Sequence, residues 1–93
     1  MLRAIAIDDE PLALEIMRNH ASKVEFINLE ACFTRSSEAR AFMQASQPDL
    51  LFLDIKMPDI NGIDFISGIA NPPMTIFTTA YSEHAVKGFE LNA

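Results

Sequence analysis

The sequence predicts an α/β domain built on a doubly wound parallel sheet, and two observations support this prediction. Short apolar runs alternate along the chain with segments of helical periodicity, in the order βαβαβαβα. The run at residues 50–53 is apolar at every position, as expected of a central strand that helices cover on both faces. Strands in this order form a parallel sheet through right-handed helical crossovers.

The first unit is a strand at residues 2–7 that ends in Asp8-Asp9-Glu10, followed by a helix. Pro11 suits the first turn of that helix, because its missing N–H costs no hydrogen bond there. The helix is expected to bury an apolar stripe against the sheet, made of Leu12, Ile16 and His20 with Ala13 and Met17 beside them.

The second unit begins with a strand at residues 26–33 and continues into a helix that reaches about residue 46. Ser36 or Ser37 is expected to cap this helix with its hydroxyl group. Apolar residues at helical spacing are expected on its inner face, namely Ala39, Phe42 and Met43.

The last two units complete the alternation. Residues 50–53 form the third predicted strand, and a weak helix follows between about residues 63 and 70, because Asn71-Pro72-Pro73 must end it. Residues 74–78 form a fourth strand rich in β-branched side chains. Ser82 is expected to cap a final helix that begins at Glu83.

Composition narrows the class of protein. A chain of 93 residues suits one domain with one core, and the single cysteine, Cys32, cannot form an internal disulfide. The net charge of −6, with its basic residues scattered, argues against direct nucleic-acid binding. No apolar run approaches the roughly 18 residues of a membrane span, and acids follow the N-terminus too early for a signal peptide. The sequence therefore predicts a cytoplasmic protein with no membrane partner.

Polar residues follow the strands where the site of such a sheet is expected, outside the carboxyl ends. The strands before Asp8-Asp9 and Asp54 should be neighbours, so these three acids should crowd one pocket. Like charges about 4 Å apart repel by roughly 4 kcal/mol at an effective dielectric near 20, so either a proton or a cation must neutralise them. With oxygen ligands only, Mg²⁺ is the best match for a cation.

A magnesium ion gives Asp54 a chemical role. A carboxylate beside a divalent cation can attack phosphorus and form an acyl phosphate, so Asp54 is the candidate nucleophile. Thr79 is expected to donate its hydroxyl to a phosphoryl oxygen, and Lys56 to lend its backbone carbonyl to the metal. Pro58 and Gly62 are expected to shape the loop that follows Asp54.

These residues resemble the receiver domains of two-component response regulators. The matching stretches are "AIAIDDEP", "PDLLFLDIKMPDINGIDF" and "TIFTTAYSEHAVKGFELNA", which occur in the order that the family has. The combination of Asp-Asp, Asp, Met-Pro, Gly and Thr-Ala is highly specific. The last stretch is most similar to receivers that precede a LytTR-type DNA-binding domain.

The resemblance implies a flavodoxin-like (CheY-like) fold with strand order 2-1-3-4-5. It implies that Asp54 is the phosphoacceptor for a histidine kinase, that Asp8, Asp9 and Asp54 hold Mg²⁺, and that Thr79 is the switch hydroxyl. It also implies a signalling domain rather than a turnover enzyme, with a C-terminal output domain that binds DNA and controls transcription.

The sequence departs from the family at its end. Family members continue past "GFELNA" into a fifth strand and a fifth helix, with a lysine that pairs with the phosphoryl group, so residues 1–93 are expected to be a receiver domain incomplete at its C-terminus. The fourth strand is then expected to be an open sheet edge that favours a homodimer or an exchanged oligomer.

Two other functions stay open. One is a pseudo-receiver that serves as a docking or dimerisation module without phosphate chemistry, which the missing lysine favours. The other, weaker one is a haloacid-dehalogenase-type phosphatase, which needs a second acid two residues after the nucleophile. Lys56 occupies that place after Asp54.

Overall fold

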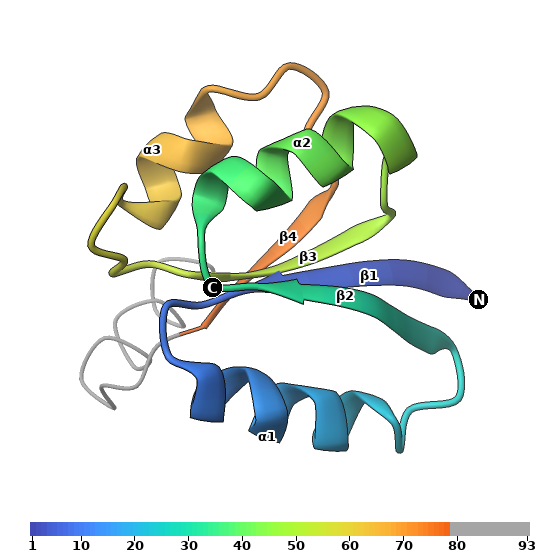
Figure 1. Ribbon diagram of the computed structural model, residues 1–93. Helices are drawn as coiled ribbons and strands as arrows, with labels where there is room; N and C mark the ends of the chain where they lie inside the picture. Colours follow the sequence, from blue (N-terminus) through green and yellow to red (C-terminus); the bar gives the residue numbers. More distant parts are fainter. Residues whose placement is uncertain (79–93) are drawn as a thin grey trace, which may run out of the picture.

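A computed structural model describes residues 1–78 as a parallel sheet between two layers of helices (Figure 1). The strands are β1 (Leu2–Ile7), β2 (Ile27–Phe33), β3 (Leu50–Asp54) and β4 (Met74–Thr78), and the helices are α1 (Pro11–Ala21), α2 (Ser36–Ser46) and α3 (Gly62–Ser67). The sheet order is β2-β1-β3-β4, with every neighbouring pair parallel. The predicted fold class and the order of these four strands are confirmed, whereas the helix expected from Glu83 lies outside the described residues.

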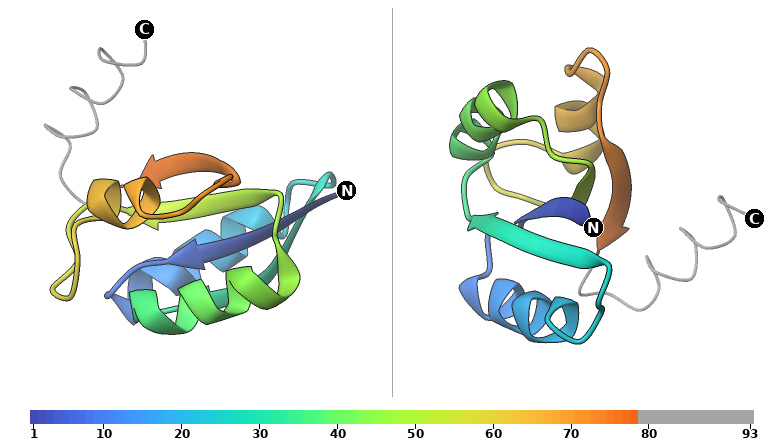
Figure 2. Two further views of the ribbon diagram at one scale, coloured as in Figure 1. Left: turned by 90° about the horizontal axis from the view of Figure 1, so that it is seen from above. Right: turned by 90° about the vertical axis from the view of Figure 1, so that its right-hand side faces the viewer.

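Helix α1 covers one face of the sheet, and α2 and α3 cover the other (Figures 1 and 2). The main core lies under α2 and α3, because alternate residues of the central strands point to that face. Ile5 pairs with Leu51 and Ile7 with Leu53, and all four side chains are buried. They pack against three buried side chains from the helices, which are Ala39, Met43 and Phe65.

The buried stripe predicted for α1 is wrong. Leu14 and Ala21 are the buried residues of this helix, whereas Leu12 and Ile16 are 64% and 52% exposed and His20 is also exposed. The apolar residues of α1 are dense enough to offer more than one stripe, and tertiary packing selects the one that contains Leu14. Ala13 and Met17, predicted beside the stripe, are half-buried.

The ends of α2 and α3 also differ from the prediction. The capping residue of α2 is Arg35, whose side chain makes no capping hydrogen bond, so neither Ser36 nor Ser37 is the cap. Helix α3 begins at Gly62 and ends at Ser67, before the Asn-Pro-Pro segment expected to end it. The Asn61 side chain caps it by accepting a hydrogen bond of 2.8 Å from the Ile63 N–H.

A polar network around Arg3 joins the elements at the amino ends of the strands. The Arg3 guanidinium donates to the Glu30 carboxylate of β2 at 3.1 Å and to the Ser46 carbonyl at the end of α2 at 3.0 Å. The Arg3 backbone N–H donates to the Asp49 carboxylate at 2.9 Å, and the Asp49 N–H donates to the Arg3 carbonyl at 2.8 Å. These bonds fix the register of β1 beside the start of β3.

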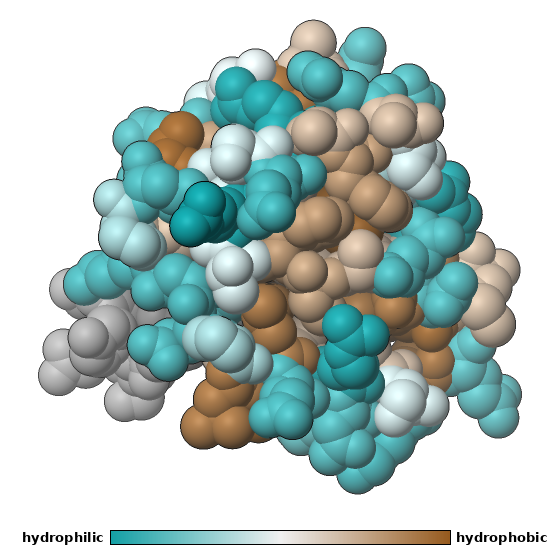
Figure 3. All heavy atoms as spheres, in the orientation of Figure 1, coloured by the Kyte–Doolittle hydropathy of each residue, from teal (hydrophilic) through white to brown (hydrophobic). Residues whose placement is uncertain are grey.

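Apolar surface remains on the outside of the molecule. One face shows a band of apolar atoms between α2 and α1, crossed by hydrophilic side chains (Figure 3). On β4, the side chains of Met74, Ile76 and Phe77 are all exposed. None of the three helices within residues 1–78 has the length and apolar character needed to cross a bilayer.

Candidate functional site

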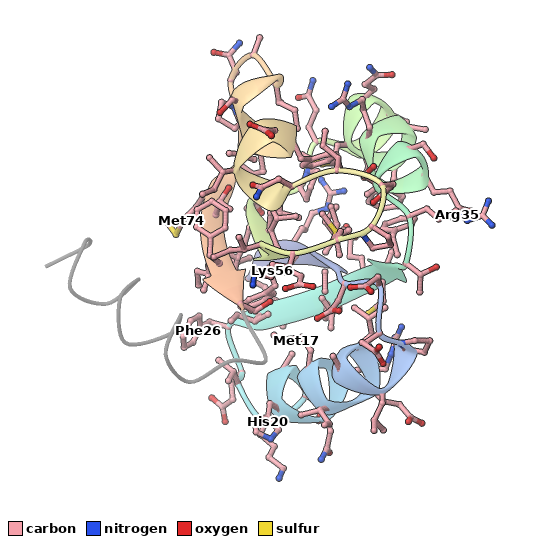
Figure 4. The ribbon with its side chains drawn as sticks, turned by 90° about the vertical axis from the view of Figure 1, so that its left-hand side faces the viewer. Met17, His20, Phe26, Arg35, Lys56 and Met74 are labelled. Carbon is pink, nitrogen blue, oxygen red and sulfur yellow. The ribbon has the colours of Figure 1, made fainter. Side chains whose placement is uncertain are left out.

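Strand pairing brings three acids together at the carboxyl end of the sheet, the end that faces the viewer in Figure 4. Ile7 pairs with Leu53, so Asp8 follows β1 beside the place where Asp54 ends β3. One carboxylate oxygen from each of Asp8, Asp9 and Asp54 lies within 4.8 Å of the other two. The convergence of these acids that the sequence predicted is therefore confirmed.

Backbone bonds hold the segment that carries Asp8. The Asp8 N–H donates to the Phe33 carbonyl at the end of β2 at 3.0 Å. Its carboxylate Oδ1 accepts a hydrogen bond of 3.0 Å from the Glu10 N–H, which turns the chain toward α1. Both ends of the turn are thus fixed before α1 begins at Pro11.

Burial and mutual repulsion disfavour the charged form of these acids. Asp54 is only 9% exposed, and this burial, together with the negative charge of Asp8 and a hydrogen bond with Asp9, raises its pKa to about 6. A hydrogen bond from the backbone of Lys56 acts in the opposite direction. Burial likewise raises the pKa of Asp8, against a hydrogen bond from the backbone of Glu10.

The donor set of the pocket suits a hard divalent cation. Two carboxylate charges within 4.8 Å of each other repel by at least roughly 3 kcal/mol at an effective dielectric near 20, and a cation between them is attracted to both. All three ligands of the cluster are carboxylate oxygens, which Mg²⁺ and Ca²⁺ prefer and which zinc sites rarely use alone. The sequence also left open a proton held among these acids, and the raised pKa of Asp54 is consistent with that alternative.

The loop after Asp54 folds back tightly on the end of β3. The Gly62 N–H donates to the Ile55 carbonyl at 2.7 Å, which closes the loop at its base. A Cβ atom at Gly62 would lie 2.4 Å from the Asp54 carbonyl oxygen, so only glycine permits this approach. Within the loop, Met57 is buried in the core beside Phe65.

Two predicted site residues are not tested by this geometry. The backbone of Lys56 reaches the Asp54 carboxylate, but the contribution of its carbonyl to a metal stays a prediction. The Ile55 N–H donates to the Thr78 carbonyl at 3.3 Å, which brings the end of β4 next to the pocket. Thr79 follows directly but lies outside the described residues, and so its role also stays a prediction.

Sequence reasoning missed one contact close to the site. The Asp59 carboxylate, in the loop after Asp54, accepts hydrogen bonds from Ser36 at the start of α2. The sequence contained a signal for it, because Ser36 was correctly placed at a helix start and Asp59 lies in a polar loop. The pairing across 23 residues required the three-dimensional structure.

Known proteins resemble the chain along its whole length. Residues 4–93 match the family model described as response regulator receiver domain. The chain is 35% identical over 96 residues to the transcriptional regulatory protein BtsR of Escherichia coli, and 34% identical over 99 residues to the sensory transduction protein LytT of Bacillus cereus. These matches cover 100% of this chain but 40% of BtsR and 39% of LytT.

A solved structure shows the same fold. The response regulatory domain of protein mrkE from Klebsiella pneumoniae superimposes with a TM-score of 0.77 and 32% sequence identity. The match covers 99% of this chain and 78% of that chain.

Proposed function

The chain belongs to the family of response regulator receiver domains, and from this premise we propose that Asp54 accepts a phosphoryl group from a histidine kinase. The likeness to LytTR-type regulators expected from the sequence is confirmed by the relatives BtsR and LytT. As a receiver domain the protein is a signalling domain and not a turnover enzyme. The observation that carries the proposal is the buried carboxylate of Asp54 at the end of β3, with the oxygens of Asp8 and Asp9 within 4.8 Å.

In this proposal the residues of the pocket have separate tasks. Asp8, Asp9 and Asp54, with the backbone carbonyl of Lys56, bind Mg²⁺. When bound, the ion offsets the negative charge of the carboxylates and of the incoming phosphoryl oxygens. An oxygen of Asp54 attacks phosphorus and forms an acyl phosphate as the bond to the donor breaks. The hydroxyl of Thr79 and backbone N–H groups of the loop donate to the phosphoryl oxygens.

The ionisation of Asp54 fits this chemistry. Its carboxyl must be ionised to attack, and a pKa of about 6 leaves it mostly ionised at neutral pH even before a cation binds. The same burial that raises the pKa also removes water from around the nucleophile. Fewer water molecules must then leave the carboxylate before its oxygen can attack phosphorus, which makes it more reactive than a carboxylate in bulk water.

The partners of the whole protein follow from its relatives. The chain spans about 40% of the length of the curated relatives that it matches, and one of them is named a transcriptional regulatory protein. We propose that residues 1–93 act as the receiver part of a cytoplasmic regulator. Phosphorylation of Asp54 would then control a C-terminal, DNA-binding output domain.

Intact mass spectrometry tests the phosphoacceptor role. The chain is incubated with acetyl phosphate and Mg²⁺, with Asp54→Asn as the matched control. We expect a gain of one phosphoryl group that is lost on mild alkaline treatment, that requires the metal, and that is absent from the variant. A gain that persists in Asp54→Asn would refute the assignment of the acceptor.

The second candidate function is a docking or dimerisation module without phosphate chemistry. The apolar side chains exposed on β4, Ile76 and Phe77 among them, favour it, since such surface marks interaction sites. The same experiment separates the two functions. A chain that self-associates but gains no phosphoryl group under any metal condition would support the docking module.

A further inference from the structure

The contact between Asp59 and Ser36 connects the loop after Asp54 to helix α2. Oδ2 of Asp59 accepts a hydrogen bond of 3.0 Å from the Ser36 N–H and one of 2.6 Å from the Ser36 hydroxyl. Both bonds have an ionised acceptor, a class stronger than bonds between neutral groups. Hydrogen bonds from Ser36 and from the backbone of Asp59 and Ile60 hold the pKa of this carboxyl below its ordinary value.

Helix α2 has no other side chain in this role within the described residues. Its capping residue, Arg35, makes no side-chain capping bond. The first N–H groups of a helix lack partners inside the helix, and a negative charge near them is favourable. The carboxylate of Asp59 therefore supplies, from a different part of the chain, the cap that the sequence around Ser36 does not provide.

The same contact limits the freedom of the loop at residues 55–61. The loop is closed at its base by the Gly62 N–H on the Ile55 carbonyl, and Met57 is held in the core. Asp59 adds an anchor on the far side, next to the start of α2, where Figure 4 shows the loop passing close to the residue labelled Arg35. Lys56, whose backbone reaches Asp54, follows Ile55 at the base of the loop and precedes the two held residues, Met57 and Asp59.

We propose that Asp59 is a positioning residue for the site. By binding Ser36 it holds the loop in the arrangement that brings the backbone of Lys56 to the Asp54 pocket, where Mg²⁺ binds. This inference rests on the proposed function, but it concerns a contact outside the acidic cluster. Coupling between two sites is reciprocal, so Mg²⁺ in the pocket must also stabilise the contact between Asp59 and Ser36.

Metal affinity and amide hydrogen exchange together test the inference. The dissociation constant for Mg²⁺ is measured by calorimetry for the unmodified chain, Asp59→Ala, Ser36→Ala and the double variant. Glu38→Ala is the matched control, because it removes one negative charge from an exposed position in the first turn of the same helix. Circular dichroism checks that each variant is folded.

We expect Asp59→Ala to weaken Mg²⁺ binding by about three- to tenfold, less than the roughly 10- to 100-fold typical of a residue bonded directly to a metal ligand. Ser36→Ala should have a smaller effect, because the Ser36 N–H remains, and the double variant should be no worse than Asp59→Ala. Asp59→Asn keeps an acceptor oxygen and should restore part of the affinity. Glu38→Ala should bind Mg²⁺ as the unmodified chain does.

Hydrogen exchange gives a readout that does not depend on phosphorylation. In Asp59→Ala the amides of Ser36, Lys56 and Gly62 should exchange faster, and Mg²⁺ should slow exchange at Ser36 in the unmodified chain. Equal Mg²⁺ affinity in Asp59→Ala and the unmodified chain would overturn the inference and leave the phosphoacceptor role standing. Conversely, affinity that depends on Asp59 in a chain that takes no phosphoryl group would overturn only the proposed function.

Discussion

At the scale of single residues, the environment of Asp54 shifts its pKa in two opposite directions. Burial and the neighbouring charge of Asp8 favour its protonated form, while the backbone of Lys56 favours its ionised form. The balance leaves a carboxyl whose charge changes close to neutral pH. Such a group makes the stability of the metal-free protein depend on pH.

The free energy of unfolding of the metal-free chain should fall as pH rises from about 4 to about 6. The pKa of Asp54 is raised from an ordinary value of 3.8 to about 6, so the folded state binds more protons than the unfolded state across this range. The raised pKa of Asp8 adds an effect of the same sign.

Urea denaturation with a chelator present, at pH 4.5 and at pH 7, measures this dependence. Asp54→Asn should show a weaker pH dependence, which keeps only the part due to Asp8, and should be more stable than the unmodified chain at pH 7. Asp64→Asn, an exposed acid of α3, serves as the control and should keep the dependence. Stability that increases from pH 4.5 to pH 7 in the unmodified chain would contradict the assignment.

Gly62→Ala should destabilise the protein and disturb the pocket together. The added Cβ would meet the Asp54 carbonyl oxygen at 2.4 Å, and the backbone must move to relieve the clash, at a cost of roughly 1–3 kcal/mol. Gly68→Ala is the matched control, since its Cβ would meet nothing nearer than 3.6 Å, and should change stability by no more than about 0.5 kcal/mol. Urea denaturation measures the stability of both variants, and calorimetry measures their Mg²⁺ affinity. Equal losses in Gly62→Ala and Gly68→Ala would show that the close approach at Gly62 is unimportant.

The clustering of the acidic residues in one pocket could be predicted from the sequence, because the strand order alone brings Asp8 and Asp54 together. Each acid follows an apolar run, which places it at the end of a strand. Parallel pairing of β1 with β3 then brings these two strand ends side by side. The partner of Asp59 could not be predicted in this way. Its bond joins two surface segments whose separation depends on the exact path of a loop.

At the scale of elements, the strands could be predicted closely and the helices less so. The first and fourth strands have the predicted bounds, residues 2–7 and 74–78, because Asp8-Asp9 follows the end of the first and Pro72-Pro73 comes directly before the fourth. The buried side of α1 depended on packing, since its sequence offers competing apolar stripes and the one that contains Leu14 is buried. The bounds of α2 were predicted closely, but its cap was missed because a distant residue, Asp59, bonds its first N–H.

Strand β4 leads to a prediction about self-association. β4 pairs with β3, no strand within residues 1–78 pairs with its other edge, and Ile76 is 45% exposed. We expect the chain to self-associate through this edge, because unpaired N–H and C=O groups beside apolar side chains favour strand addition. Ile76→Lys should shift it toward the monomer in sedimentation velocity experiments.

A matched variant distinguishes the edge from general hydrophobicity. Ile63→Lys makes the same change at an isoleucine of α3 that is 52% exposed, and it should leave self-association intact. A monomeric unmodified chain at high micromolar concentration would rule out this role for β4. Equal loss of association in both variants would point to apolar surface in general instead.

At the scale of the whole molecule, Mg²⁺ should raise stability through the acidic pocket. A ligand that binds only the folded state stabilises it by about 2.7 kcal/mol at a concentration 100 times its dissociation constant. Thermal unfolding at pH 7 should therefore shift to higher temperature as Mg²⁺ is added, and removal of the metal should reverse the shift. Asp54→Asn should respond much less, whereas an equal response in both chains would place the ion elsewhere.

The Arg3 network and the acidic pocket lie at opposite ends of the same strands, and the contrast between them has a consequence for how the protein tolerates change. At the amino end, guanidinium, carboxylate and carbonyl groups satisfy one another, so the frame of the sheet is complete without any ligand. At the carboxyl end, the carboxylates of Asp8, Asp9 and Asp54 lie close together, and their mutual repulsion is not compensated by a basic side chain of the cluster. A cation or phosphoryl group that enters the carboxyl end therefore changes the repulsion among these acids, and the loops around Asp54 can move in response. The bonds of Arg3 at the amino end are unaffected by that change, so the sheet keeps its arrangement.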